Sequence, residues 1–358
     1  MRAAVAYEAG APLVVEDVEP LPVGPRDVVV RLSASGICHT DLTVIKGLSA
    51  LPLPILPGHE GCGVVEEVGP EVRRVKVGDR VLASVSPACG SCWWCVNGMS
   101  NHCELKPIVS STPRVRLGDH RLAPAVCGCG TFAEAMTVHE ASVVAVETDL
   151  VDEELALLGC GVTTGLGAAL NTARVTPGSS VAVIGCGGVG QSVIQGAAIA
   201  GAATIVAVDP ASGRREASLA RGATDVVDPT TADPVEQVRA LTAGRGADFS
   251  FEVVGRPELM VQAFDMARAA GTVVLVGMPD KDAVLSLPAL RSIFSGKRLV
   301  GSVVGDADIL RDFPRFIQLA EVGKLDLGSL VSRRIKLDEI NDGIDWLARA
   351  EGVRTVVV

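Results

Sequence analysis

The stretch that decides the fold reads Val181-Ala-Val-Ile-Gly185-Cys-Gly187-Gly-Val-Gly190. A short apolar strand runs directly into G-x-G-x-x-G, and a helix is expected to follow. Gly185 permits a tight turn, Gly187 lets the backbone approach a pyrophosphate, and Gly190 lets the helix pack on the strand. The helix N-terminus offers free N–H groups to an anion. The spacing therefore predicts a dinucleotide site at Gly185, Gly187, Gly188, Val189 and Gly190; a glycine-rich turn in an unliganded domain is the alternative.

A carboxylate follows 19 residues after Gly190, where Ile205-Val-Ala-Val-Asp209 ends a second apolar strand. In this position Asp209 can accept hydrogen bonds from ribose hydroxyls, and its negative charge would repel a 2'-phosphate. The sequence therefore favours NAD over NADP. Arg214, five residues later, either bridges to the adenosine ribose or lies in solvent.

Apolar strands alternate with helical segments around this stretch. We expect strands at Val181–Ile184, Thr204–Val208, Asp225–Val227, Phe249–Val254, Thr272–Val276 and Leu299–Val304. We expect helices at Gly188–Ala200, Arg214–Arg221, Pro234–Thr242, Glu258–Ala269 and Pro288–Ser295. Six strands with intervening helices predict an α/β fold with one doubly wound, six-stranded parallel sheet of the Rossmann type.

The two ends of the chain have a different pattern. Before about residue 160, short β-rich runs separated by Gly and Pro predict an irregular β domain whose loops carry chemistry. These runs are Asp27–Leu32, Gly63–Val68, Asp79–Ser84 and Phe132–Val138. After about residue 305 we expect helices at Pro314–Glu321 and Leu337–Ala350 and a strand at Arg354–Val358, which return to the first domain.

The composition excludes some partners. The chain has 42 acidic and 32 basic residues and a net charge of -10, which disfavours a nucleic-acid surface and favours a small-molecule partner. Val175 to Val208 carries no formal charge and is long enough for a membrane helix. Its seven glycines and its change of periodicity instead favour a buried strand, helix and strand. The first residues lack the pattern of a signal peptide, so we expect a cytoplasmic protein.

Four of the ten cysteines form a compact array, Cys89-Gly-Ser-Cys92-Trp-Trp-Cys95 followed by Cys103. Without a sign of secretion, such a cluster indicates a metal site before it indicates disulfides. Four thiolates can close a tetrahedron around zinc and leave no position for substrate. We therefore expect a structural zinc in a lobe at about 86–106; an iron–sulfur cluster or free thiols are the alternatives.

A reactive metal needs an incomplete ligand shell, and its candidates lie outside this array. They are Cys38 in Gly36-Ile-Cys-His-Thr-Asp41, His59 in Gly58-His-Glu60, and Cys160 in Gly159-Cys-Gly161. Two thiolates and one imidazole would nearly neutralise zinc and leave a fourth position for water or alcohol. Spacing alone cannot assemble these residues, because each taken singly is more typical of a buried cysteine or a loop histidine.

The joint arrangement of six motifs resembles the zinc-containing medium-chain alcohol dehydrogenases, and within them a bacterial, class III-like subgroup. The motifs are Cys38-His-Thr-Asp41, Gly58-His-Glu60, the Cys89 to Cys103 array, Gly159-Cys-Gly161, Gly185 to Gly190, and Arg354-Thr-Val356. Two cysteines and one histidine are the catalytic zinc ligands known from alcohol dehydrogenases. The resemblance covers essentially the whole chain. It implies a GroES-like catalytic domain at 1–161, an NAD-binding Rossmann domain at 162–303 and a return to the first domain at 304–358.

The resemblance also implies roles for single residues. The catalytic zinc ligands would be Cys38, His59 and Cys160, with Glu60 as a transient ligand. Asp41 would hold His59 in one tautomer, and Thr40 would hydrogen-bond the substrate oxygen. The implied cofactor contacts are His39 and Arg354 at the pyrophosphate, Thr164 and Val254 at the nicotinamide, and Gly277 and Met278 nearby. Thr43 departs from the pattern, because many relatives carry there a histidine that passes the proton to solvent.

The implied activity is reversible, NAD-linked oxidation of a primary alcohol to an aldehyde, with one catalytic and one structural zinc per subunit. Small residues at Val85 and Ser49 favour a long, branched or aromatic alcohol. Leu158-Gly-Cys-Gly-Val-Thr-Thr-Gly-Leu-Gly167 also resembles thiol-adduct formaldehyde dehydrogenases, which are the alternative. A zinc-free quinone or enone reductase and a zinc-ribbon binding module are more distant alternatives. The resemblance implies a homodimer through the sheet edge at 299–303, with a tetramer as a further option.

Overall fold

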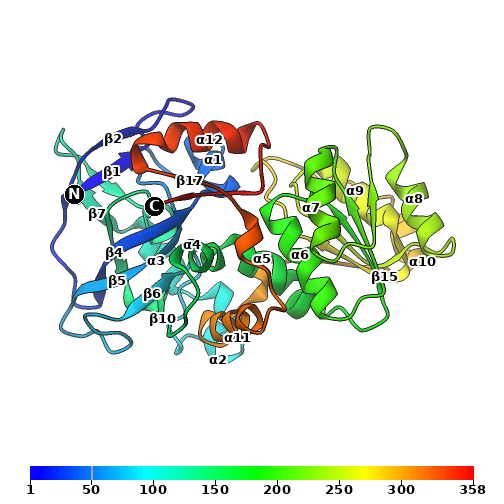
Figure 1. Ribbon diagram of the computed structural model, residues 1–358, viewed down its shortest axis with the longest axis horizontal. Helices are drawn as coiled ribbons and strands as arrows, with labels where there is room; N and C mark the ends of the chain where they lie inside the picture. Colours follow the sequence, from blue (N-terminus) through cyan, green and yellow to red (C-terminus); the bar gives the residue numbers. More distant parts are fainter. Residues whose placement is uncertain (50) are drawn as a thin grey trace. The chain divides into compact units, whose positions relative to one another are not determined.

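The protein is described by a computed structural model that covers residues 1–49 and 51–358. The chain divides into two compact units (Figure 1). Unit 1 comprises Met1–Cys160, Ala307–Gly323 and Leu327–Val358; unit 2 comprises Gly161–Asp306 and Lys324–Asp326. The short segment Lys324–Asp326 joins unit 2 because the Gln195 amide exchanges two hydrogen bonds with the Asp326 backbone, at 3.1 and 2.7 Å. From sequence we placed the divisions at 161/162 and 303/304 and did not foresee this segment.

Unit 2 is built on one parallel sheet whose strand order is β13-β12-β11-β14-β15-β16. The strands are β11 (Ser180–Ile184), β12 (Thr204–Val208), β13 (Asp225–Val227), β14 (Ala247–Glu252), β15 (Ala267–Leu275) and β16 (Arg298–Gly301). The predicted six-stranded, doubly wound parallel sheet is confirmed. The strand order reverses between β11 and β14, and in such sheets a ligand binds at this point, outside the carboxyl ends of the strands.

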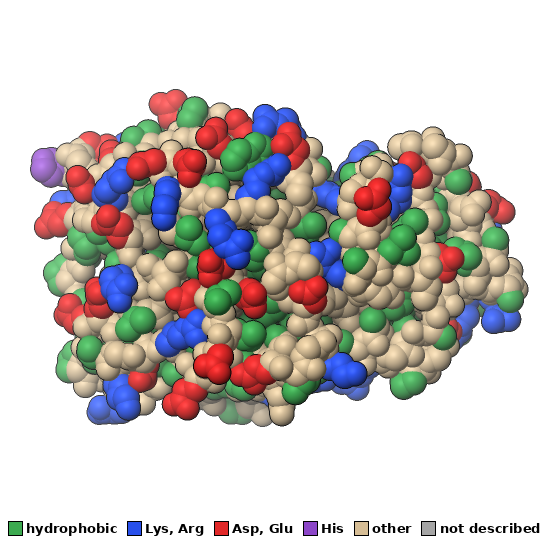
Figure 2. All heavy atoms as spheres, in the orientation of Figure 1, with side chains coloured by type: hydrophobic (Ala, Val, Ile, Leu, Met, Phe, Trp, Pro, Cys, Tyr) green, Lys and Arg blue, Asp and Glu red, His purple; other side chains and the backbone are tan. Residues whose placement is uncertain are grey.

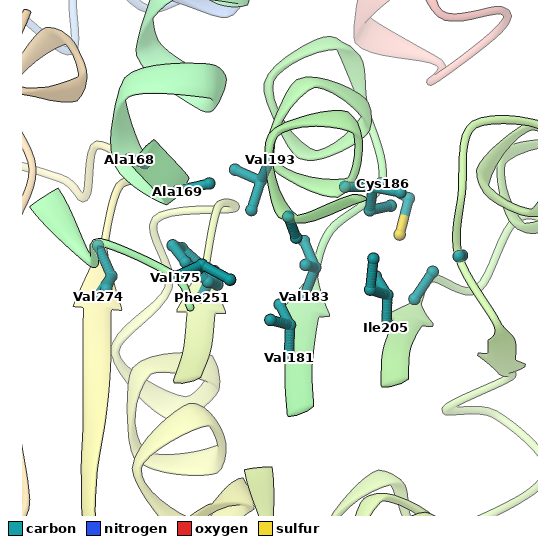
Figure 3. Close-up of a cluster of buried hydrophobic side chains, with 14 residues drawn as sticks. Ala168, Ala169, Val175, Val181, Val183, Cys186, Val193, Ile205, Phe251 and Val274 are labelled. Carbon is teal, nitrogen blue, oxygen red and sulfur yellow. The ribbon is translucent and has the colours of Figure 1, made fainter. Parts of the chain in front are cut away.

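Helices cover both faces of this sheet. They are α5 (Gly161–Gly167), continued by a π-helical turn (Ala168–Thr172), α6 (Gly188–Ile199), α7 (Ser212–Ala220), α8 (Pro234–Leu241), α9 (Pro257–Met266) and α10 (Ala289–Ser295). Val181 and Val183 of β11 face the core that Val193 of α6 completes (Figure 3). The residues between them, Ala182 and Ile184, face the second core under α8 and α9. Because both faces are buried, the strand needs no polar residue, which explains the uncharged run around it.

Several predicted boundaries in unit 2 are wrong. The strands expected to end at Val254 and Val304 end at Glu252 and Gly301. We expected a helix at Glu258–Ala269, but α9 ends at Met266 and the chain enters β15 at Ala267, which has extended backbone. The residues Ala267 to Ala270 favour a helix by local propensity. Pairing of Ala267 with Ala247 on β14 overrides that preference.

Unit 1 contains a seven-stranded sheet in which β10, β6, β5, β4, β18 and β17 are neighbours in that order and β9 also pairs with β4. Its strands are β4 (Asp27–Gly36), β5 (Glu60–Val68), β6 (Arg80–Ala83), β9 (Ala135–His139), β10 (Val143–Ala145), β17 (Val331–Ile335) and β18 (Arg354–Val357). Smaller sheets contain β1 (Arg2–Val5) with β2 (Val14–Asp17), and β3 (Glu19–Pro20) with β7 (Pro113–Arg116) and β8 (Leu122–Pro124). The predicted irregular β-rich domain is confirmed.

Helices in unit 1 were largely missed from the sequence. They are α1 (His39–Ile45), α2 (Trp93–Val96), α3 (Leu105–Ser111), α4 (Asp152–Ala156), α11 (Ile309–Glu321) and α12 (Ile340–Ala348). We expected α11 to begin at Pro314, because proline favours a first helical turn. The helix begins earlier because Asp308 caps it, accepting the N–H of Leu310 at 3.0 Å, and Pro314 lies inside it.

The distribution of surface charge and the lengths of the helices are relevant to nucleic-acid and membrane partners. Figure 2 shows acidic and basic side chains interspersed over the visible face of unit 1. Within residues 1–49 and 51–358 no single helix is both long and apolar enough to cross a membrane. Asp152–Gly159 and Gly161–Thr172, which are separated by a bend, meet the length and composition criteria only as a pair.

Candidate active site

The sheet of unit 1 brings three distant segments together. Gly36, at the end of β4, pairs with Glu60 of β5 on one side and with Val356 of β18 on the other. Cys38 therefore lies just beyond one strand, and His59 just before its neighbour. Cys160 follows a short 3-10 turn at Leu157–Gly159.

The ligand atoms of Cys38, His59, Glu60 and Cys160 all lie within 4.8 Å of one another. Cys38, His59 and Glu60 are buried, and Cys160 is partly exposed. The structure thus gathers the three residues that the sequence could not assemble by spacing, together with the proposed transient ligand.

Asp41 orients the histidine. Its Oδ1 lies 2.9 Å from His59 Nδ1, and the same carboxylate accepts the backbone N–H groups of Gly58 at 2.8 Å and Cys38 at 3.2 Å. His59 Nε2 is buried and has no hydrogen-bond partner among the described residues. Burying a ring nitrogen without a partner costs free energy, and a ligand bound to this atom would remove that cost.

The thiols are electrostatically linked to the histidine. A hydrogen bond with the Cys160 thiol lowers the pKa of Cys38. Burial raises this pKa, but the net result is a pKa well below its ordinary value. The same hydrogen bond, together with burial, raises the pKa of Cys160. Burial lowers the pKa of His59, but the charges of Asp41 and Cys160 more than offset it and hold that pKa well above its ordinary value. Thiolate sulfur and a neutral imidazole are ligands that zinc prefers, so the donor set fits this ion.

Glu60 is held by an arginine from the far end of the chain. Its carboxylate forms a buried ion pair with Arg354, the first residue of β18. Gly36 leaves room for this pair, because a Cβ there would collide with Glu60 Oε2 and lie 3.1 Å from Arg354 Nη2. Arg354, which the resemblance implied at a pyrophosphate, thus contacts the proposed transient zinc ligand. Sequence analysis missed this contact and gave Gly36 no role.

Thr40 lies on the first turn of α1, and its Oγ1 is 4.0 Å from Cys38 Sγ. His39 is exposed at the start of the same helix. The Thr43 hydroxyl donates to the carbonyl of His39 at 3.0 Å. Thr43 is therefore engaged with its own helix.

The second cysteine cluster is also preassembled. Cys89 Sγ lies 3.8 Å from Cys95 Sγ, and Cys92 Sγ lies 3.9 Å from Cys103 Sγ. Four sulfurs about 2.3 Å from a central zinc would lie about 3.8 Å apart, so these separations fit the ion. Burial raises the pKa of Cys89, but the backbone N–H groups of Ser91 and Cys92 lower it to about 6. One thiolate of the set is thereby favoured near neutral pH.

The glycine stretch has the geometry that its spacing predicts. Gly185 has φ +91°, a conformation that L side chains rarely adopt. A Cβ at Gly190 would overlap the carbonyl oxygen of Gly185, so only glycine fits where α6 crosses β11. Gly187 caps α6 and faces open space, where a Cβ would meet only Arg214 Nη1 at 3.8 Å. The N-terminus of α6 is therefore accessible to an anion.

Asp209 is more buried than its implied role requires. It ends β12, is 3% exposed, and accepts the N–H groups of Cys186 at 2.8 Å and Ala211 at 2.9 Å. Arg214 Nη1 lies 4.0 Å from Asp209 Oδ2. Arg214 therefore does not point into solvent; it lies between Asp209 and the glycine turn.

Val254 and Gly277, two further implied cofactor residues of unit 2, lie just beyond the carboxyl ends of β14 and β15. Val254 packs against Gly185, and Gly277 packs against Gly255. Val254 and Met278 are exposed, and Thr164 of α5 is partly exposed. Sequence analysis missed Glu252, the buried last residue of β14. Its Oε1 accepts the N–H groups of Val254 at 2.9 Å and Gly255 at 2.7 Å and so fixes this turn. An acidic residue at the end of an apolar strand was the available signal.

Comparison with known proteins gives consistent matches. Residues 24–148 match the alcohol dehydrogenase GroES-like domain, and residues 188–321 match the zinc-binding dehydrogenase family. Alcohol dehydrogenase 6 of Peromyscus maniculatus is 36% identical, with 100% of this chain and 97% of the relative covered. S-(hydroxymethyl)glutathione dehydrogenase of Synechocystis sp. is 35% identical, with 99% of each covered. Among solved structures, benzyl alcohol dehydrogenase of Acinetobacter calcoaceticus has a TM-score of 0.92 at 31% identity, covering 99% of this chain and 98% of its own.

The chain belongs to the zinc-containing medium-chain alcohol dehydrogenases, a family of oxidoreductases that act on alcohols. The resemblance that the six motifs indicated is thereby confirmed.

Proposed function

We propose that this enzyme oxidises a primary alcohol to an aldehyde with NAD, and reduces the aldehyde in reverse, at a zinc ion held by Cys38, His59 and Cys160. The observation that carries the proposal is the convergence of these ligand atoms, with Glu60, within 4.8 Å. The unpartnered Nε2 of His59 supports it, because a zinc ion would satisfy that atom.

Different residues of unit 1 have different roles in the proposed reaction. When bound, zinc supplies Lewis-acid chemistry that lowers the pKa of the alcohol hydroxyl toward neutrality. Asp41 holds His59 in the tautomer that leaves Nε2 to the metal. Thr40 Oγ1, beside Cys38, takes the hydrogen bond of the substrate hydroxyl and starts proton release. Because the Thr43 hydroxyl is engaged by the His39 carbonyl, we infer that water or His39 completes the relay.

NAD is the cofactor that the residues of unit 2 fit best. The partly exposed N-terminus of α6 at Gly187, Gly188 and Val189 would hold the pyrophosphate. Asp209 places a carboxylate at the end of β12, where a 2'-phosphate would be repelled. The bound cofactor supplies the hydride acceptor.

We infer a long, branched or aromatic substrate from the small side chains of Val85 and Ser49. The similarity to a benzyl alcohol dehydrogenase supports this class. The similarity to an S-(hydroxymethyl)glutathione dehydrogenase favours a second candidate, oxidation of a thiol adduct of formaldehyde. Activity with formaldehyde that depends on added glutathione would select the second candidate; activity with benzyl and long-chain alcohols that needs no thiol would select the first.

The central test replaces one ligand. Cys38→Ser should abolish turnover and remove one zinc per subunit, while NAD affinity, measured by fluorescence titration, stays within about threefold. The matched control is Cys62→Ser, a buried cysteine outside both clusters and outside the glycine turn, whose Sγ lies 3.3 Å from Asp152 Oδ1. A Cys38→Ser enzyme that lacks zinc at this site yet turns over alcohol at the original rate would refute the proposal.

Two further assignments accompany the proposal. We infer a homodimer through β16, the edge strand of the unit 2 sheet, because Leu299 of this strand and Val303 just beyond it are 41% and 40% exposed. Light scattering tests this inference. We also infer a cytoplasmic location, because all ten cysteines are free of disulfides and two thiolate sites require a reducing compartment.

A further inference from the structure

The segment that carries the four cysteines contains no charged residue to balance a metal–thiolate cluster. Between Ser86 and Cys103 the sequence has no Lys, Arg, Asp or Glu. Zinc with four thiolates carries a net charge of about −2. Backbone N–H groups of Ser91 and Cys92 contact Cys89 Sγ at 3.4 and 3.2 Å, but these dipoles add no net positive charge. The balancing charge must come from outside this segment, and Glu104 and Lys106, which follow it directly, are of opposite sign.

Arg74 reaches the lobe from the loop between β5 and β6. Its Nη2 donates to the carbonyl oxygen of Cys89 at 3.1 Å. The guanidinium also lies against Gly90, where a Cβ would be 3.7 Å from Nη2. The side chain of Arg74 thus contacts the peptide that carries the first cysteine of the array.

Arg74 is partly buried, and its guanidinium has no anionic partner among residues 1–49 and 51–358. Its Nη1 is buried and forms no hydrogen bond within the described part of the chain. Arg26, Arg80 and Arg114 of the same unit pair with carboxylates, whereas no ion pair forms between Arg74 and a described acidic residue. Glu140 accepts only the backbone N–H of Arg74. A cation in this position is costly unless an anion lies close by.

We propose that Arg74 is the counter-charge of the structural zinc site and slows the loss of its metal. The inference rests on the proposed assignment of zinc to the four cysteines. The negative charge of the thiolate cluster stabilises the unpaired guanidinium, and the guanidinium in turn stabilises the thiolates against release of zinc. Its hydrogen bond to the Cys89 carbonyl positions the loop that begins the array.

The test measures zinc release from the holoenzyme into excess 4-(2-pyridylazo)resorcinol. The phase that Cys38→Ser abolishes belongs to the catalytic ion, and the remaining phase reports the four-cysteine site. Arg74→Gln keeps a hydrogen-bond donor but removes the charge, and should speed the remaining phase about tenfold, as changes beside metal ligands do. Arg74→Lys keeps the charge and should release zinc within about threefold of the wild-type rate.

Arg73→Gln is the matched control. Arg73 also gives its backbone N–H to Glu140, at 2.7 Å, but its side chain is exposed. It should not change the rate. Equal acceleration by Arg73→Gln, or by Arg74→Lys, would overturn the counter-charge role. If Arg74→Gln does not fold, the rate of zinc release from the wild-type enzyme is measured at several salt concentrations instead. Zinc release that becomes faster with ionic strength supports the charge pairing, and zinc release that does not depend on salt overturns it. A wild-type enzyme with only one zinc per subunit, lost in Cys38→Ser, would overturn this inference while leaving the catalytic site intact.

Discussion

The carboxylate of Asp41 lies 2.9 Å from Nδ1 of His59, and both side chains are fully buried. The same carboxylate accepts the N–H groups of Gly58 and Cys38. One side chain therefore ties together the two loops that carry the first two zinc ligands and sets the direction in which the imidazole faces.

Replacing Asp41 should weaken zinc binding without removing a ligand. We expect Asp41→Ala to lower the affinity of the catalytic site for zinc about 10- to 100-fold, because the ring loses its fixed orientation. Asp41→Asn keeps an acceptor oxygen and should lose less. The measurement is zinc content after dialysis against a graded series of chelator concentrations. An Asp41→Ala enzyme that holds zinc as tightly as the wild type would show that the ring is oriented by packing alone.

Replacing Cys92 should affect stability before chemistry. Cys92→Ser removes one of four thiolates whose metal contributes folding energy directly. We expect the free energy of unfolding to fall by several kcal/mol, with a loss of about 2–4 °C in Tm for each kcal/mol. Differential scanning calorimetry with zinc analysis checks both effects. An unchanged melting profile, with two zinc ions still bound, would contradict the structural role.

Gly36 should not tolerate even one methyl group. A Cβ at this position would collide with Glu60 Oε2, which cannot swing away while Arg354 holds it, and would lie 3.1 Å from Leu157 Cδ2. We expect Gly36→Ala to cost about 1–3 kcal/mol by overpacking and to lower turnover by displacing Glu60. Gly118→Ala, at an exposed site where a Cβ meets nothing within 4 Å, is the control. Equal stability and turnover in the two variants would show that the Glu60 side chain can move aside.

The sequence was most informative where local pattern and structure agree. The strand, glycine turn and helix from Ser180 to Ile199 have a strong periodic signal, and the predicted sheet of unit 2 followed from repeating it. Boundaries failed where tertiary pairing overrides propensity, as at Ala267.

The candidate site was less predictable from local pattern. Glu60 and Arg354 are 294 residues apart, and no periodicity indicates that they form a buried ion pair. The gathering of Cys38, His59 and Cys160 was inferable only from resemblance to a family, because it depends on the lateral pairing of Gly36 with Glu60 and Val356. Whether an arginine pairs with a carboxylate or with a backbone carbonyl, as Arg74 does with that of Cys89, likewise depends on contacts between distant loops.

Glu140 provides a test of stability that depends on pH. Its buried carboxylate accepts the backbone N–H groups of Arg73 at 2.7 Å and Arg74 at 3.0 Å and pairs with Arg26 at 2.7 Å. Burial raises the pKa of Glu140, but these three partners together lower it by more than burial raises it. The pKa therefore lies below its ordinary value of 4.5.

A carboxylate whose folded pKa is lowered contributes stability that is fully present above its unfolded pKa and is lost as the pH falls through the folded value. Glu140→Gln should therefore cost about 2 kcal/mol at pH 7, since hydrogen bonds to a charged group are lost. The difference from the wild type should shrink as the pH falls below 4.5. Urea unfolding followed by tryptophan fluorescence at several pH values measures this difference. A cost that stays constant down to pH 3 would mean that Glu140 acts through shape and not through its charge.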